Sequence, residues 1–529
     1  MLLVLGGLAL LVPPDQPWSA DDGAYHHAVR LVREEGRWYE ERPELDLVEH
    51  PGRYPLALSD VDEAGRAFPY VKHPGWILAL VGSTTAFGDV WGLVIPGLAA
   101  VAVAATLAWR LSRRLDIAAS PLAFWLVALG PLAIIGLGYW AHTVAAALGG
   151  IAALLLYGLA RRPSLVAASL LGAVGATLVL VRSEGVLLVA ALTGALVIAR
   201  IGQRAAARGW LDPIIVLALP AMAYVAEKAW VASLVEGQLV STEPPDRPVG
   251  WLDGRVSGAW HTFGAHSPGS SGHQLVLWAA TGLVVVGLAT WAHRGLWPRA
   301  CVAAGVLLTL ILAGWGSLGL VSGIVPAWPA LVAGLVVLVG RRTGHRPEVR
   351  ALAITCLIYT ALVLATQYPT GGGIDWGGRF MAPVAVPLAV LSALGLVGAV
   401  SSTPEGSLEG RRGLVGAVVM SAVAVAVLGL IATGDARSEV DAILADVRAA
   451  SPDVAVAAKG SFVARYDLRG ASPAWVRADG DGLDAAVERA FAGGAGRVAV
   501  VGRGARDVSV PGTRSTAVGG SVALLTRGP

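Results

Sequence analysis

The feature that most constrains this chain is a series of about thirteen apolar runs, most of them close to 20 residues long. A helix needs roughly 20 apolar residues to cross a bilayer, so each run predicts a membrane-spanning helix. Of the 529 residues, 55% are hydrophobic and 15% are charged, whereas soluble domains have roughly 25% charged residues. We therefore expect an α-helical polytopic membrane protein and exclude an ordinary soluble enzyme.

The predicted spans occupy residues 1–12, 88–109, 120–138, 142–160, 164–182, 185–199, 213–233, 275–292, 299–316, 319–340, 351–366, 381–400 and 414–433. The first run is short and ends at Pro13 and Pro14. It has neither the basic segment nor the small-residue cleavage site of a signal peptide, so we interpret it as a membrane anchor or the end of one.

Arginine marks one side of the predicted membrane domain. If the first span enters from the cytoplasm, alternation of the spans places most basic connections on the cytoplasmic side, as the positive-inside rule requires. These residues are Arg110, Arg113, Arg114, Arg161, Arg162, Arg200, Arg204, Arg208, Arg294, Arg299, Arg341, Arg342, Arg346, Arg350, Arg411 and Arg412. The Arg-rich, Asn-free composition is typical of a GC-rich bacterial genome. We expect a bacterial plasma-membrane protein with a cytoplasmic N-terminus.

The same alternation leaves four segments on the extracytoplasmic side, at residues 13–87, 234–273, 367–379 and 435–529. The membrane domain then covers residues 1–434, and the last segment lacks long apolar runs. Its pattern predicts a small α/β domain with helices at 435–450 and 483–492 and strands at 454–457, 498–501 and 522–525. Because the cytoplasmic connections are brief and basic, we expect the functional machinery on the extracytoplasmic face.

Two consecutive carboxylates, Asp21 and Asp22, follow the first span at the start of a helix predicted for residues 22–35. Such residues, like Ser19 before them, suit a helix N-cap. One capping residue is sufficient, however, so the other carboxylate is available as a general base for an acceptor hydroxyl.

Further ionisable residues lie at the predicted outer ends of spans. Arg182 and Glu184 stand between two spans, and Asp375 and Arg379 belong to a Gly-rich loop. Each of them also suits a helix end in the head-group layer, but several spans bring charge to the same face. Glycine allows close approach to a ligand, and Arg binds phosphate by paired hydrogen bonds.

Lys72 and His73 precede an apolar segment that is too short to span the bilayer. We expect this segment to lie flat on the outer leaflet. Lys72 and His73 can contact either lipid head groups or the substrate, and the sequence does not distinguish these two roles.

The chain resembles the GT-C superfamily of integral membrane glycosyltransferases, because these residues follow one another in the family's order and are expected on the same side of the membrane. That group includes protein O-mannosyltransferases, aminoarabinose transferases and mycobacterial arabinofuranosyltransferases. The resemblance rests on a D-[DE]-x-x-[YF] motif at Asp21–Tyr25, an HP pair at His73–Pro74, R-x-E-G at Arg182–Gly185 and G-G-R-F-x-x-P at Gly377–Pro383.

The resemblance implies an inverting glycosyltransferase that takes a sugar from a polyprenyl phosphate at the outer leaflet. It points to Asp21 or Asp22 as the base, with the family's usual base at the first position. Arg379, helped by Arg182 or Lys72, would bind the phosphate. The acceptor can be a lipid, a protein or a wall polysaccharide.

Other readings remain open. The pair Asp60 and Asp62 in the first outer segment suits a divalent ion, but no cofactor is otherwise indicated. The net charge of +3 gives no basis for nucleic-acid binding. A transporter or flippase would also have many helices and few charges, and a non-catalytic cell-envelope scaffold is the third class.

Overall fold

The chain is described by a computed structural model that covers residues 7, 19–56, 59–203, 207–242, 250–264, 271–293, 295–315, 320–340, 346–366, 376–401, 408–458, 473–478, 482–502 and 504–527. Asp375 and most of the predicted first span lie outside these residues. The chain divides into two compact units. Unit 1 comprises Met1–Pro13, Val94–Glu227 and Val249–Thr433, and unit 2 comprises Pro14–Leu93, Lys228–Pro248 and Gly434–Pro529.

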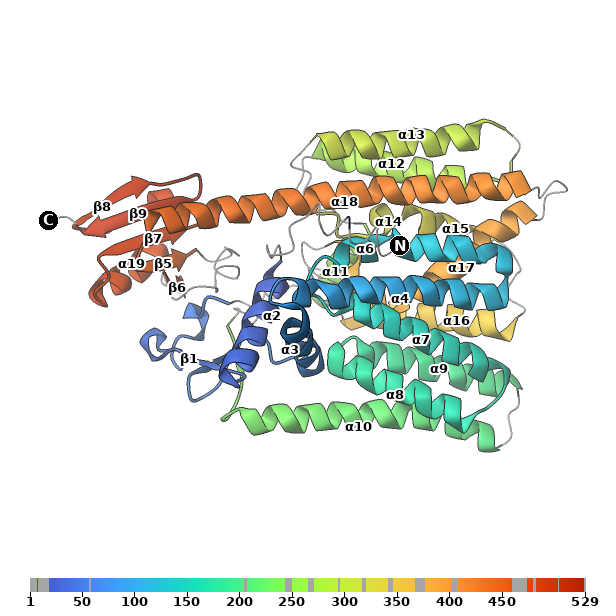
Figure 1. Cartoon of the computed structure of the whole chain (residues 1–529), viewed down its shortest axis with the longest axis horizontal. Coiled ribbons are helices and arrows are strands. Elements are labelled where there is room, and N and C mark those ends of the chain that lie inside the picture. Colours follow the sequence, from blue (N-terminus) through green and yellow to red (C-terminus); the bar gives the residue numbers. More distant parts are fainter. Residues whose placement is uncertain are drawn as a thin grey trace. The chain divides into compact units, whose positions relative to one another are not determined.

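Unit 1 is built of helices, as the apolar runs predict. Figure 1 shows α7, α8 and α9 running alongside one another, and α12 beside α13. Unit 1 contains all or most of each of the helices α4 (Trp91–Leu115), α5 (Ser120–Ala128), α6 (Pro131–Ile135), α7 (His142–Arg161), α8 (Leu165–Val181), α9 (Gly185–Gln203), α10 (Leu211–Leu234), α11 (Trp251–Phe263), α12 (Ser271–Ala289), α13 (Trp297–Gly314), α14 (Ile324–Ala327), α15 (Pro329–Val339), α16 (Pro347–Thr366), α17 (Ala385–Ser401) and α18 (Leu408–Ala450).

Ten helical segments among the described residues are long and apolar enough to cross a membrane. Three further apolar helices are shorter: α8, α15 and α3 (Pro74–Phe87). Every predicted span after the first therefore corresponds to a helical segment, and the prediction of a polytopic helical membrane protein is confirmed. The exact number of crossings stays a prediction.

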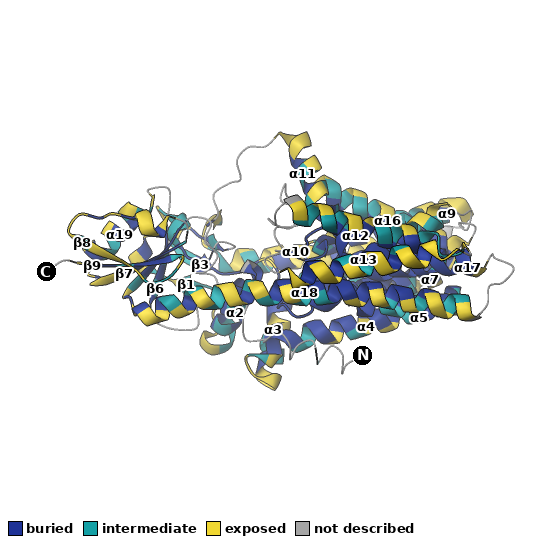
Figure 2. Cartoon of the chain, turned by 90° about the horizontal axis from the view of Figure 1, so that it is seen from above, coloured by how far each residue is buried: buried dark blue, intermediate teal, exposed yellow. Residues whose placement is uncertain are grey.

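Burial distinguishes central helices from peripheral ones in unit 1. Within the apolar stretch of Arg379–Ser401, 94% of the residues are buried, whereas in that of α10 only 17% are buried. Exposed apolar side chains on α10 include Ile214, Leu217 and Val225. Figure 2 likewise colours much of α13 as exposed. An apolar exposed surface of this kind is what a lipid-facing helix presents.

Four of the basic connections predicted to share one side lie together in unit 1. Arg346 donates from Nη1 to the carbonyl of Leu115 at 2.7 Å, and Arg161 lies 3.1 Å from the Glu348 carboxylate. Nearby, Arg200 donates to the carbonyl of Leu159 at 3.0 Å. The ends of α4, α7, α9 and α16 are therefore neighbours, which agrees with alternating crossings.

Unit 2 begins with α2 (Ala20–Arg30), which continues into a π-helical turn, η1 (Leu31–Glu35). The predicted helix over 22–35 is confirmed, with a changed geometry in its last turn. Two segments predicted to be extracytoplasmic, residues 13–87 (the first outer segment) and 234–273 (the second outer segment), contribute the strands of one sheet. Its order is β1 (Glu40–Glu41), β3 (Arg66–Phe68), β2 (Asp60–Val61) and β4 (Val240–Ser241). Strand β4 comes from the second outer segment and pairs antiparallel with β2.

The C-terminal region forms an α/β sandwich around a five-stranded sheet. Its order is β6 (Ala474–Arg477), β5 (Val454–Ala457), β7 (Arg497–Val501), β9 (Val522–Arg527) and β8 (Thr513–Ala517). Helix α19 (Gly482–Ala492) covers one face, and the end of α18 covers the other. Figure 2 shows the buried central strands. The three predicted strands are confirmed, whereas β6 and β8 were missed because their sequences lack a continuous apolar run.

Two differences from the predicted organisation concern this region. The helix predicted for 435–450 is the continuation of α18, which runs unbroken from the membrane segment. In addition, the C-terminal region packs with both outer segments. Arg477 donates from Nε to the carbonyl of Gly52 at 2.8 Å and from Nη2 to the carbonyl of Thr242. Unit 2 is thus assembled from three distant parts of the sequence.

Candidate functional site

The acidic pair lies at the N-terminus of α2, and the structure gives its second member a structural role. The backbone N–H of Asp22 donates to Ser19 Oγ at 3.1 Å, and the Ser19 N–H donates to Asp22 Oδ2 at 3.2 Å. This reciprocal capping box uses Asp22 to satisfy a helix end. Asp21, which is 8% exposed, precedes it in the same first turn.

The structure joins two of the predicted motifs, although they are 48 residues apart. Tyr25, one turn after the acidic pair, forms a hydrogen bond between its hydroxyl and His73 Nδ1 at 3.0 Å. The ring of Tyr70 lies 4.5 Å from that of Tyr25 and 5.3 Å from that of His73. Both Tyr25 and His73 are buried. This cluster fixes the start of α2 against the start of α3.

A second polar cluster holds the middle of α2 to the first outer sheet. His27 Nε2 lies 3.0 Å from Glu40 Oε2, and the Tyr54 hydroxyl donates to the same oxygen at 2.8 Å. Burial of Glu40 acts to raise its pKa. The hydrogen bond and the charge of His27, and then the hydrogen bond from Tyr54, lower the pKa by more than burial raises it. The pKa of Glu40 is lowered to about 2. This carboxylate is therefore an ionised anchor for α2.

Lys72 is exposed next to the buried His73, so only His73 joins the cluster at α2. Lys72 acts electrostatically on Asp60, but burial is the larger effect and raises the pKa of Asp60. Asp62 pairs with Arg66 at 2.6 Å and accepts backbone bonds, including one from Ala64 N–H at 3.1 Å. Asp62 therefore stabilises its own turn, which accounts for its conformation without a bound ion.

In unit 1, the R-x-E-G motif forms a two-pronged ion pair between α8 and α9. Arg182 donates from Nε and Nη2 to the two Glu184 oxygens, at 2.8 and 2.6 Å. Arg182 is buried and stands at the C-cap of α8. Bidentate geometry of this kind fixes the guanidinium plane. Glu184 thus positions Arg182 and balances its charge.

Arg379 begins the 3₁₀ helix η6 (Arg379–Val384), immediately after two glycines. Gly377 and Gly378 have φ values of +68° and +62°, in the left-handed region. A Cβ on Gly377 would meet Pro131 Cβ at 2.4 Å, and one on Gly149 of α7 would meet the carbonyl oxygen of Pro383 at 1.9 Å. Glycine at these positions therefore allows the Arg379 segment to pack closely within unit 1.

Arg379 lies among aromatic rings that sequence reasoning did not identify. Its guanidinium carbon is 5.3 Å from the ring centroid of Trp140 and 5.6 Å from that of Phe380. The buried Tyr359 donates to the carbonyl of Phe380 at 2.6 Å.

Tyr359 also lies within electrostatic range of Glu184 and Arg182. Tyr359 and Trp140 lie in or beside apolar runs, where the sequence does not distinguish an aromatic residue near a functional site from one in the core. The sequence therefore gave no signal for them.

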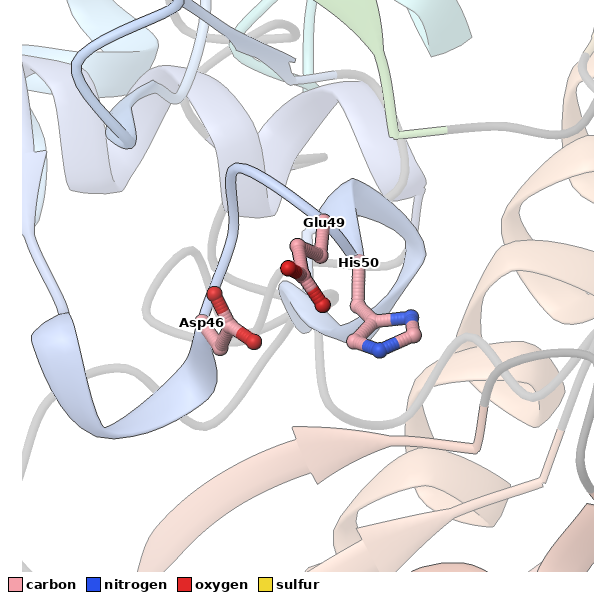
Figure 3. A group of neighbouring side chains, drawn as sticks. All are labelled: Asp46, Glu49 and His50. Carbon is pink, nitrogen blue, oxygen red and sulfur yellow. The ribbon is translucent and has the colours of Figure 1, made fainter.

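A third group, Asp46, Glu49 and His50, lies in the first outer segment (Figure 3). One ligand atom from each residue lies within 4.8 Å of the others. Asp46 and Glu49 are exposed, and exposed acidic groups of this kind are common without an ion. We assign no metal to the group.

Comparisons with known proteins complete the description. No protein-family model and no curated protein matches the chain. Two solved structures of ArnT from Cupriavidus metallidurans align with it at 15% identity. The structure bound to undecaprenyl phosphate aligns over 100% of this chain and 99% of that chain, with a TM-score of 0.47. The apo structure aligns over 100% and 97%, with a TM-score of 0.48. The functional assignment therefore rests on the chain's own residues.

Proposed function

We propose that this protein is a membrane glycosyltransferase that moves a sugar from a polyprenyl-phosphate donor to an acceptor hydroxyl. One observation carries the proposal. Asp22 caps the N-terminus of α2, so we assign the role of general base to Asp21. The hydrogen bond between Tyr25 and His73 joins this acidic motif to the start of α3. These residues are the motif positions on which the resemblance to GT-C enzymes rests. The donor proposed here is of the same lipid class as the undecaprenyl phosphate bound to ArnT.

The first half of the proposed reaction belongs to unit 2. Asp21 accepts the proton of the acceptor hydroxyl while the hydroxyl oxygen attacks the anomeric carbon. The anomeric carbon–phosphate oxygen bond breaks in the same displacement, so the configuration at that carbon inverts. The hydrogen bonds of Asp22 and Tyr25 position the helix turn that carries Asp21.

The second half belongs to unit 1, where Arg379 binds the phosphate that leaves. Negative charge grows on this group as the bond breaks, and a fixed guanidinium stabilises it. The rings of Trp140 and Phe380 lie against the Arg379 guanidinium and help to hold it in place. Arg182 is already paired with Glu184, so we assign it a supporting role.

The proposed location follows from the distribution of charge. We place the Arg-rich end of unit 1 and the N-terminus in the cytoplasm, and the outer segments and C-terminal domain outside the plasma membrane. A transporter is the alternative, but Arg182 lies at the end of α8 and Arg379 at the start of η6, rather than in the middle of a span. A scaffold would need neither Asp21 nor Arg379.

The test uses the full chain in nanodiscs. Native mass spectrometry measures the binding of polyprenyl-phosphate sugars, and incubation with envelope extract and radiolabelled donor measures transfer. We expect Asp21→Asn to lower the transfer rate by about 10²- to 10⁴-fold with donor binding retained. Arg379→Ala should weaken donor binding on the order of tenfold or more.

The matched control is Asp22→Asn, which alters the capping box rather than the proposed base. It should retain transfer, because the Asn amide oxygen can still accept from the Ser19 N–H and keep the turn that carries Asp21 in place. Full transfer by Asp21→Asn would refute the assigned base. Absence of donor binding by the folded wild type would refute the function and favour the transporter or scaffold.

A further inference from the structure

Unit 2 contains a cavity of about 400 Å³ that the proposed reaction does not yet use. This volume falls within the range of small-ligand sites. The cavity lies along α2 and η1, and the turn between α3 and α4 closes its other side. Its lining residues are His26, Val29, Arg30, Arg33, Glu34, Thr84, Asp89, Val90 and Leu93.

One face of α2 supplies the cavity wall. His26, Arg30 and Arg33 recur at intervals of four and three residues, so they lie above one another on the helix. Asp22, one turn before His26, belongs to the same stripe. At 1.5 Å per residue, His26 is about 6 Å and Arg30 about 12 Å along the axis from Asp22. The cavity wall therefore starts one helical turn beyond Asp22, and about 7.5 Å along the axis beyond Asp21, the proposed base.

The end of this wall has an unusual backbone. Residues Leu31–Glu35 form a π-helical turn, which changes the direction of the side chains that follow α2. Arg33 and Glu34 lie in this turn and both line the cavity. π-Helical turns occur frequently at functional sites, where they redirect side chains.

The charges of the cavity are of both signs. Arg33 donates to Glu34 at 3.0 Å from Nη2 and to Asp89 from Nη1. A bound phosphate would face the carboxylates of Glu34 and Asp89 as well as the guanidinium groups. A hydroxylated ligand suits this arrangement better, because each hydroxyl both donates to a carboxylate and accepts from a guanidinium.

The rest of the lining is apolar. Val29 and Leu93 are buried, and Val90 is partly buried in the turn between α3 and α4. An apolar floor with a few charged donors and acceptors around it matches the two surfaces of a sugar ring, whose C–H groups and hydroxyls face different directions. The lining therefore has the chemistry of a carbohydrate site.

We propose that this cavity binds the acceptor and that the acceptor is a carbohydrate chain of low net charge. The inference rests on the proposed function, because it assigns to the transferase an acceptor class. The acceptor hydroxyl lies toward the N-terminus of α2, where Asp21 stands, and the preceding sugar units occupy the cavity beside Arg30, Arg33 and Asp89.

The test measures sugar binding without donor, so that it does not depend on transfer. Mannotriose, maltotriose and arabinotriose are the probes, with inorganic phosphate as the anionic comparator. Saturation-transfer NMR on the full chain in nanodiscs measures binding. We expect at least one trisaccharide to bind the wild type, and excess phosphate to leave that binding unchanged.

Two variants locate the site. Val90→Trp fills the cavity and should weaken trisaccharide binding at least tenfold, whereas Val48→Trp, at an exposed valine of the same unit, should not. Asp89→Asn, at an exposed position, removes the negative charge that pairs with Arg33, and it should weaken binding severalfold. Its control is Asp46→Asn, an exposed carboxylate outside the cavity.

The outcomes separate this inference from the proposed function. Sugar binding that Val90→Trp leaves unchanged, or failure of all three trisaccharides to bind, overturns the inference even when donor lipid binds. Competition by phosphate would indicate an anion site instead. Loss of sugar binding in Val90→Trp, with no polyprenyl-phosphate sugar bound by any variant, would support the cavity and refute the transferase.

Discussion

At the scale of single residues, adjacent and chemically identical side chains have different tasks. Asp21 and Asp22 are indistinguishable by type, but the bonds between Ser19 and Asp22 commit the second carboxylate to the helix end. Glu40 is likewise committed, since His27 and Tyr54 surround its carboxylate. Local hydrogen bonding thus commits Asp22 and Glu40 to structural roles.

The lowered pKa of Glu40 predicts how the stability of unit 2 depends on pH. Because this pKa falls from 4.5 to about 2 on folding, the stabilisation is complete above pH 4.5 and is lost as the pH falls toward 2. Its size is on the order of 3 kcal/mol. Glu40→Gln should lower the melting temperature at neutral pH, and its difference from the wild type should shrink at pH 3.

Thermal unfolding monitored by circular dichroism between pH 3 and pH 7 checks this expectation. Glu41→Gln, an exposed position on the same strand, is the control and should follow the wild type. An identical pH profile for Glu40→Gln and the wild type would contradict the role assigned to the carboxylate.

At the scale of elements, small residues determine how closely the Arg379 segment approaches its neighbours. Gly149 on α7 lies against Pro383 of η6, and Gly377 lies against Pro131. Small residues let membrane helices approach at the backbone, where close packing replaces the hydrophobic driving force. The position of Arg379 therefore depends on glycines as much as on its aromatic neighbours.

Gly377→Ala tests this dependence. Its φ of +68° and the 2.4 Å approach to Pro131 Cβ both oppose a side chain, so we expect a loss of about 1–3 kcal/mol. Donor binding should weaken as well, because η6 shifts. Melting temperature and native mass spectrometry measure the two effects.

Gly158→Ala provides the comparison for this substitution. This glycine lies on α7, and a Cβ there would meet nothing within 4 Å. Alanine favours a helix over glycine, so the variant should be as stable as the wild type or slightly more stable. Equal effects of the two substitutions would mean that close packing at Gly377 is unimportant.

At the scale of the whole molecule, unit 2 unites segments that are far apart in the chain. Strand β4 of the second outer segment completes the sheet of the first, and Arg477 of β6 donates to Gly52 and Thr242. The first outer segment carries Asp21 and most of the residues that line the cavity. The C-terminal domain therefore supports the part of the molecule that we assign to acceptor chemistry.

Arg477→Ala should loosen this assembly. It leaves the carbonyl groups of Gly52 and Thr242 without this donor, at a cost of about 1–3 kcal/mol for each carbonyl that stays buried. We expect faster hydrogen exchange in residues 50–56 and 238–242. Arg514→Ala, at an exposed position of β8, should leave exchange in both segments unchanged. Protection in both segments equal to that of the wild type would contradict the bracing role.

The sequence by itself determined the class of this protein, because the length of an apolar run and the position of Arg are physical requirements of the bilayer. It also located α2 with Asp21, the short helix α3 and three strands of the C-terminal sheet, which depend on local pattern. Tertiary structure alone decided that Asp22 caps the helix, that Tyr25 meets His73, and that Arg477 and β4 join the outer segments. Such contacts connect residues far apart in sequence, and each depends on the packing of elements that no local pattern records.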